Sequence, residues 1–210
     1  METSRLVRTG VWLVALTMLY NALESVVALW AGIRAGSVAL VGFGLDSVIE
    51  LLAATVVLWR MSLEARGEDA HRVEMAERRV HRFVGATFFA LAAYVMFQAA
   101  WVLWTANAPD ESVVGVVLAV LSLIVMPLVA LGKLRVARAI DSPALRAEAK
   151  ETLACSYLSF CLLLGLVANA SLGFWWADPV AALLMVPWLV IEGTEASTSK
   201  GDECVTTCGG

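Results

Sequence analysis

The sequence has few of the features that a secreted or a soluble protein needs. Its 210 residues include only four cysteines, two in apolar segments and two near the C-terminus, so they form no plausible disulfide framework. Charged residues are scarce at 16%, whereas hydrophobic residues reach 60% and the mean hydropathy is +0.78. No cleavable signal peptide is evident, because the first apolar run is long and further runs follow at once. This composition excludes an ordinary soluble domain and predicts an integral membrane protein.

Six hydrophobic segments are candidates to cross a hydrocarbon core of ~30 Å. We place them at residues 9–33, 35–59, 83–108, 112–132, 152–176 and 178–191. The sixth is short and is expected to need the flanking aromatic residues 174–176 to reach across. The longer polar stretches are 60–82 and 133–151. The sequence therefore predicts an all-α fold of six transmembrane helices in a domain of residues 1–195. We expect residues 196–210 to form a flexible tail that carries Cys204 and Cys208.

The distribution of lysine and arginine predicts the orientation in the membrane. With six spans, both termini and both polar stretches lie on one side, and every basic residue except Arg34 falls there. We therefore expect cytoplasmic termini and a multi-pass protein of the plasma or inner membrane. The 60–82 stretch mixes acids and bases at helical spacing, which indicates a solvated helical extension and no surface for nucleic acid.

Three acidic residues lie deep inside the predicted spans. Asp46 and Glu50 are the only charged residues between Arg34 and Arg60, and their i, i+4 spacing puts both on one helical face near mid-membrane. Glu24 lies at a similar depth in the first span. No lysine, arginine or histidine of any predicted span is available to pair with them. Protonation, a bound cation or water in a cavity would satisfy such acids, and the default interpretation is an ion or proton site.

The fifth span adds a carboxylate and a thiol. Glu151 and Cys155 are again i, i+4 on one face, and Cys161 follows almost two turns later. Glu151 and Cys155, together with the α-helical pair Asp46 and Glu50, predict a metal site of four ligands. A mixed oxygen and sulfur set suits a divalent transition metal, Zn²⁺ first and Fe²⁺ next, whereas an all-oxygen set would favour Mn²⁺, Mg²⁺ or Ca²⁺.

Each of these residues also has a purely structural interpretation. Asp46 and Glu50 would then be neutral, hydrogen-bonded acids, and Glu24 would bond Asn21 or a neighbouring backbone group. In the same view, Glu151 would be an interfacial acid beside Lys150. Cys155 and Cys161 would simply pack in the bundle.

The stretch GSVALVGFGLDSVIELLAATVVLWR resembles the first turn and second span of the cation diffusion facilitator family, which exports Zn²⁺ and related ions in exchange for protons. The stretch ALRAEAKETLACSYLSF, followed by WADPVAALLM, is similar to the fifth and sixth spans of that family. The resemblance covers residues 9–195. It implies that Asp46 and Glu50 are metal ligands, and that Glu151 and Cys155 replace the usual His or Asp and Asp of the fifth span.

The resemblance has two departures. Family members typically carry a cytoplasmic metal-binding domain after the sixth span, so the chain resembles a membrane-domain-only member in which Cys204 and Cys208 stand in as a crude metal collector. The histidine-rich loop of zinc-specific members is also missing, since only His71 and His81 occur.

Taken together, these patterns predict proton-coupled efflux of a divalent transition metal by alternating access, with Zn²⁺ the leading candidate and Fe²⁺, Mn²⁺ or Co²⁺ open. Glu24 is a candidate proton or ion relay at the cavity mouth. The resemblance suggests a homodimer, and no organic cofactor is expected. The alternative is a non-transporting membrane protein that binds or senses metal on the same scaffold. An enzyme using Cys155 as nucleophile is not expected, because no convincing general base accompanies it.

Overall fold

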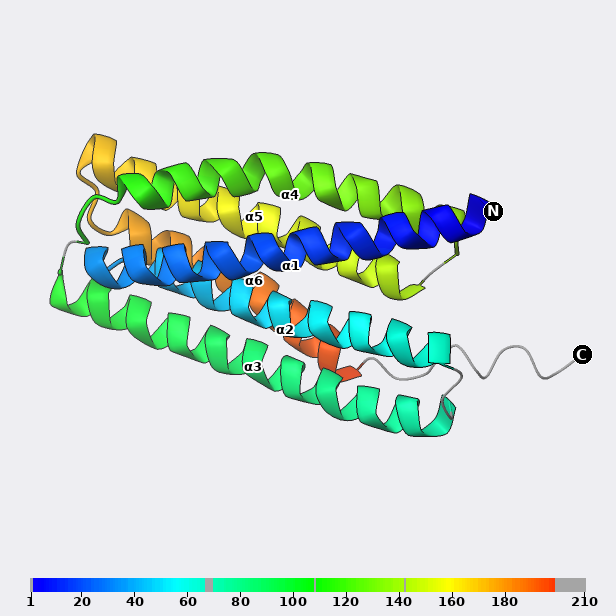
Figure 1. Ribbon diagram of the computed structural model, residues 1–210. Helices are drawn as coiled ribbons and strands as arrows, with labels where there is room; N and C mark the ends of the chain where they lie inside the picture. Colours follow the sequence, from blue (N-terminus) through cyan, green and yellow to red (C-terminus); the bar gives the residue numbers. More distant parts are fainter. Residues whose placement is uncertain (1, 67–69, 108, 142, 199–210) are drawn as a thin grey trace, which may run out of the picture.

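The computed structural model describes residues 2–66, 70–107, 109–141 and 143–198, and these residues form six long helices (Figure 1). The helices are α1 Glu2–Ala35, α2 Val38–Arg66, α3 Ala70–Thr105, α4 Val113–Ala139, α5 Pro143–Leu172 and α6 Ala177–Thr198. All six are long and apolar enough to cross a membrane. The predicted all-α fold with six membrane-spanning helices is confirmed.

Two predicted boundaries are wrong. The polar stretch 133–151 is almost entirely helical, because α4 continues to Ala139 and α5 already begins at Pro143. The sixth helix runs on to Thr198, so it does not need residues 174–176 to span the membrane. In both places a charged residue ended the predicted segment although the helix continues. Residues 196–198 of the predicted tail belong to α6. Residues 199–210, with Cys204 and Cys208, lie outside the described residues, and the division of the tail from the helical domain stays a prediction.

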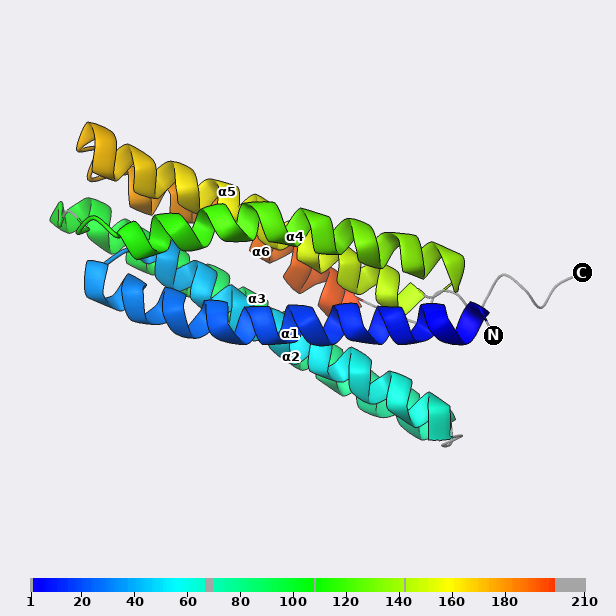
Figure 2. The ribbon, with the colours of Figure 1, turned by 45° about the horizontal axis from the view of Figure 1, so that its top comes forward.

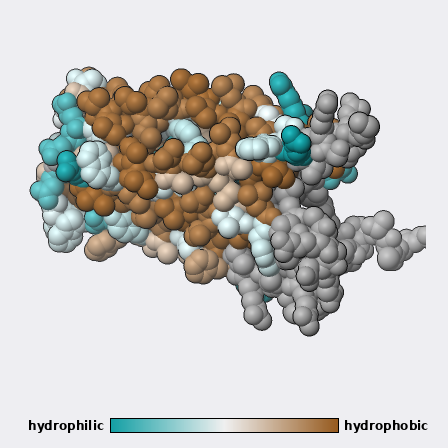
Figure 3. All heavy atoms as spheres, in the orientation of Figure 1, coloured by the Kyte–Doolittle hydropathy of each residue, from teal (hydrophilic) through white to brown (hydrophobic). Residues whose placement is uncertain are grey.

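The helices run alternately up and down the bundle (Figures 1 and 2). The α2–α3 and α4–α5 connections lie at one end, toward which α1 begins and α6 finishes; we call it the terminal end. The α1–α2, α3–α4 and α5–α6 connections lie at the opposite end. Figure 3 shows an apolar surface across the middle of the visible face, with hydrophilic residues toward the ends. This pattern fits a bundle surrounded by lipid over its middle.

Small residues let the helices approach closely. A Cβ placed on Gly165 of α5 would lie 2.6 Å from the Cβ of Ala181 on α6. A Cβ on Gly44 of α2 would lie 3.0 Å from the Cβ of Ala28 on α1. Such contacts are the usual basis of helix packing in lipid, where apolar burial adds little driving force. They hold α1 against α2 and α5 against α6 around the centre of the bundle.

A carboxylate from α6 caps the buried start of α2. Asp178, which is fully buried, accepts hydrogen bonds from the Ser37 hydroxyl and from the backbone N–H of Val38, the latter at 2.8 Å. The first N–H groups of a helix lack partners within that helix, and the positive end of the helix dipole favours an anion. Gly36, with a φ of 65°, makes the tight turn that delivers α2 to this cap. The contact sets the position of α2, and with it the acids at its middle.

Candidate metal centre

Asp46, Glu50 and Cys155 meet at the centre of the bundle. One carboxylate oxygen from each acid and the sulfur of Cys155 all lie within 4.8 Å of one another. The exposed fractions of these residues are only 3%, 7% and 0%. The donors of a tetrahedral zinc shell are about 3.5 Å apart, as its bond lengths of about 2.0–2.3 Å require. The donor atoms of the three groups are therefore at most about 1.3 Å farther apart than the ligands of one zinc ion would be.

Local helix geometry and helix packing together produce this arrangement. Asp46 and Glu50 lie one turn apart on α2, so they face the same direction, as their spacing predicted. Cys155 comes from α5, which packs against α2. The sequence predicted that these two faces meet, and the structure brings them together. Their role as metal ligands stays a prediction.

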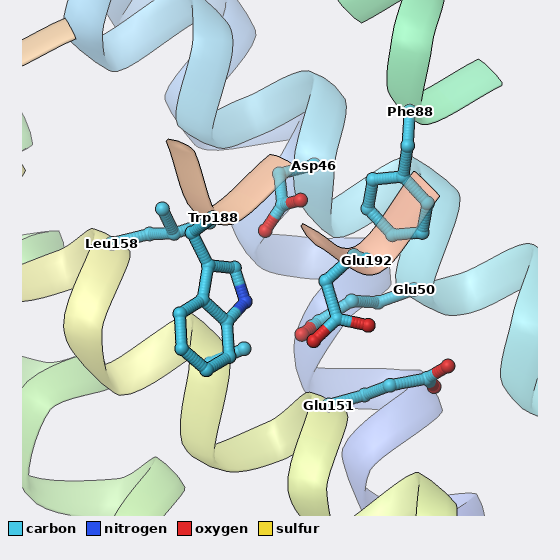
Figure 4. Close-up of a pocket in the computed structure, with 8 residues that line it drawn as sticks. Asp46, Glu50, Phe88, Glu151, Leu158, Trp188 and Glu192 are labelled. Atoms are coloured by element: carbon cyan, nitrogen blue, oxygen red, sulfur yellow. The ribbon is translucent and has the colours of Figure 1, made fainter. Parts of the chain in front are cut away.

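A small cavity adjoins the group (Figure 4). Its volume is about 10 Å³, close to the space that one water molecule occupies. Four acidic residues line it: Asp46 and Glu50 from α2, Glu151 from α5 and Glu192 from α6. The remaining lining residues are Phe88, Ala154, Leu158 and Trp188. The polar lining of the cavity is thus mostly carboxylate.

Glu151 takes part in the cavity but less closely than predicted. It lines the wall and is half-buried, but it is not part of the group whose donor atoms all lie within 4.8 Å of one another. It also faces the cavity rather than an interface beside Lys150, which is exposed. The fourth ligand position of the predicted site is therefore open to Glu151 only if its side chain moves.

Glu192 is the residue that the sequence analysis missed. The predicted sixth span ends at residue 191, because the charge of Glu192 interrupts the apolar run there. Glu192 follows Trp188 by four residues, and both line the cavity, so they share the inward face of α6. Continuing the helical pattern past this first charge would have revealed a fourth inward-facing acid.

The two carboxylates of α2 differ in their partners. Glu50 Oε2 accepts a hydrogen bond from Asn21 Nδ2 on α1, at 2.8 Å. Asp46 has no hydrogen-bond donor within the described ranges of the chain, and its carboxylate points into the cavity (Figure 4). An acid this deeply buried without a donor is costly unless a cation, a proton or water satisfies it. The hydrogen bond from Asn21 holds the Glu50 carboxylate in place, whereas no described donor occupies the Asp46 carboxylate.

Glu24 lies next to Cys155 rather than at the mouth of the cavity. Its Oε2 accepts hydrogen bonds from Ser47 Oγ at 2.9 Å and from Cys155 Sγ at 3.9 Å, and Oε1 has no hydrogen-bond partner among the residues that the structure describes. It is 1% exposed and is not among the residues that line the cavity. The predicted position at the cavity mouth is therefore wrong, because Ser47 and Cys155 hold Glu24 inside the bundle. The alternative contact with Asn21 is also wrong, since Asn21 bonds Glu50.

A buried ion pair lies inside the bundle at two residues of the predicted polar stretch 133–151. Lys133 Nζ donates to Glu148 Oε1 at 2.7 Å and to Thr152 Oγ1 at 2.9 Å, and the lysine is fully buried. The sequence predicts a polar stretch at Lys133, because hydropathy cannot distinguish a solvated lysine from one paired inside protein. It does not hydrogen-bond Glu24, Asp46 or Glu50, so those acids still lack a basic partner in the described structure. Cys161 lies in the apolar core, as its packing interpretation proposed.

Comparisons with known proteins point in one direction. The family described as "Cation efflux transmembrane domain" matches residues 14–200. A Synechocystis protein named "Uncharacterized transporter sll1263" is 27% identical over 151 residues, which are 70% of this chain and 49% of the relative. The chain thus spans about half the length of the curated relative that it matches.

Proposed function

The chain belongs to the cation efflux family of membrane transporters, a family of transporters rather than enzymes, and from this premise we propose that it exports a divalent transition metal from the cytoplasm in exchange for protons. Zn²⁺ is the leading substrate. The observation that carries the proposal is the gathering of Asp46, Glu50 and Cys155 at mid-bundle beside a cavity. Two carboxyl groups and a thiol buried together destabilise the bundle if nothing binds them, whereas a divalent ion would satisfy all three once they lose their protons.

The donor set supports a transition metal over Mg²⁺ or Ca²⁺. Asp46 and Glu50 supply hard oxygen donors, and Cys155 supplies a soft sulfur that favours Zn²⁺ or Fe²⁺. Glu151 is the proposed fourth ligand, reached by rotation of its side chain within the cavity wall. Mn²⁺ and Co²⁺ fit the same oxygen donors and stay as alternatives.

Exchange with protons follows from the chemistry of the ligands. Carboxylates and a thiol bind metal only after they lose their protons, so metal and protons compete for the same atoms. In the proposed cycle the site opens to the cytoplasm, loads metal and releases protons; it then opens to the other side, where protons displace the metal. Cytoplasmic termini, a plasma or inner membrane and a homodimer complete the proposal, the first from the clustering of lysine and arginine.

The test is uptake into proteoliposomes that contain a zinc-sensitive dye and carry a pH gradient. The wild-type protein is expected to give saturable uptake that depends on the gradient. Asp46→Asn keeps the shape of the side chain and is expected to lose this uptake. Asp110→Asn, at an exposed acid outside the site, is the matched control and should behave as the wild type.

The outcome separates the two functional hypotheses. Uptake by Asp46→Asn equal to that of the control would contradict the site. Stoichiometric zinc binding by the wild type, without uptake under any gradient, would support a non-transporting metal-binding protein instead.

A further inference from the structure

Three glutamates from three helices surround one side of the cavity (Figure 4). They are Glu50 on α2, Glu151 on α5 and Glu192 on α6. Glu50 follows Asp46 by four residues along α2, which runs toward the terminal end of the bundle. Glu151 precedes Cys155 by four residues along α5, which runs the opposite way. Glu50 and Glu151 are therefore each about one turn, or about 6 Å, nearer the terminal end than Asp46 and Cys155, respectively.

Glu192 extends this layer onto the sixth helix. Helix α6 runs toward the terminal end, and Glu192 lies one turn beyond Trp188, whose indole forms part of the cavity wall. The cavity thus joins two layers, a central one with Asp46 and Cys155 and an outer one of three glutamates.

The lining of the cavity favours a bound cation. Its described lining residues include four acids and no lysine, arginine or histidine. Asp46 is 3% exposed, has no hydrogen-bond donor among the described residues, and points into this space. Anionic groups that converge without partners in a buried site repel one another unless a positive charge lies among them.

We propose that Glu192 binds the transported divalent cation in an outer position formed with Glu50 and Glu151, from which the ion passes to Asp46, Glu50 and Cys155. This inference rests on the proposed function. The outer position offers only carboxylate oxygens, so it accepts hard and borderline divalent ions alike. The central position adds the sulfur of Cys155 and selects the softer ions. Glu50 belongs to both positions and hands the ion from one to the other.

The test uses Co²⁺ as the probe, because a cobalt–thiolate bond gives a charge-transfer absorption that reports binding at Cys155. The full-length protein is titrated in detergent in a Cys204→Ser/Cys208→Ser background, and Cys155→Ser identifies the part of the band that belongs to Cys155. Glu192→Gln removes the charge and keeps the shape. Glu195→Gln is the matched control, since Glu195 is an exposed acid on the same helix.

Glu192→Gln is expected to raise the Co²⁺ concentration at half-maximal absorption about tenfold while the band at saturation stays unchanged. The half-saturation concentration for uptake into proteoliposomes should rise in parallel, with a smaller change in maximal rate. Glu195→Gln should match the background protein in both assays. Equal midpoints for the two glutamine variants would overturn the role of Glu192.

Two further results distinguish a failure of the outer position from a failure of the proposed function. Absence of both the thiolate band and uptake in the background protein would overturn the proposed function, whereas normal uptake with an unaffected Glu192→Gln would overturn only the outer position. If Glu192→Gln is not monodisperse, Glu192→Asp is titrated in its place. It keeps the charge but withdraws it by one methylene, so a raised midpoint supports the proposal and an unchanged midpoint contradicts it.

Discussion

Lys133 Nζ and Glu148 Oε1 lie 2.7 Å apart in an ion pair that joins α4 to α5 inside the bundle. Both side chains are almost completely buried, and Thr152 accepts a second hydrogen bond from the lysine. Glu148 is three residues, or nearly one turn, from Glu151 on the cavity wall. The ion pair therefore braces the part of α5 that carries one of the candidate ligands.

Loss of this lysine should be costly. Lys133→Met leaves Glu148 as an unpaired buried acid and is expected to lower the free energy of unfolding by about 3–5 kcal/mol. Thermal unfolding of the purified protein in detergent measures the effect. Lys150→Met, at an exposed lysine of α5, should leave the transition unchanged. The double variant Lys133→Met/Glu148→Leu should recover most of the loss, and an equally destabilised double variant would argue against pairing as the cause.

Cys155 should decide which metals the central group prefers. Cys155→Ser replaces a soft donor by a hard one, so the affinity for Zn²⁺ should fall at least about tenfold and the affinity for Mn²⁺ much less. Competition between the two ions in equilibrium binding measures the ratio. Cys161→Ser changes a buried cysteine of the same helix outside the group and serves as control. An unchanged preference in Cys155→Ser would remove the thiol from the ligand set.

Asn21 should act through Glu50. Its side-chain amide donates to Glu50 Oε2 at 2.8 Å, so Asn21→Ala frees the carboxylate to leave the orientation that faces Asp46 and Cys155. We expect the half-saturation concentration for zinc uptake to rise about tenfold, because removal of a group that orients a ligand weakens metal binding by that order. Asn107→Ala, at an exposed asparagine, is the control. Loss of protein yield with unchanged half-saturation would assign Asn21 to folding alone.

Asp178 should stabilise the bundle without contributing to metal binding. Asp178→Ala removes the acceptor for Ser37 and for the first N–H groups of α2, and should cost about 2 kcal/mol or more. Asp178→Asn keeps one acceptor oxygen and should fall between the wild type and the alanine variant. Thermal unfolding measures the series, with Asp110→Ala as an exposed control near the same end. Equal stability of Asp178→Ala and the control would exclude the cap as a stabilising contact.

Much of the fold was predictable because lipid imposes a simple requirement on sequence. A helix facing hydrocarbon must be apolar over its length, and this marked all six helices. Hydropathy failed where a polar residue meets protein instead of lipid. It ended the fourth segment before Lys133 and the sixth before Glu192, although both residues continue their helices.

The candidate site was likewise predictable only in part. The backbone geometry of one helix is local, so the sequence alone determined that Asp46 and Glu50 share a face, and that Glu151 and Cys155 share another. Only the tertiary structure decided that Cys155 approaches the α2 acids more closely than Glu151, that Asn21 pairs with Glu50, and that Glu192 lines the same cavity. These relations depend on how each helix is rotated and where it crosses its neighbour. Close contacts such as that between Gly165 and Ala181 set those quantities, and no periodicity within a single segment contains them.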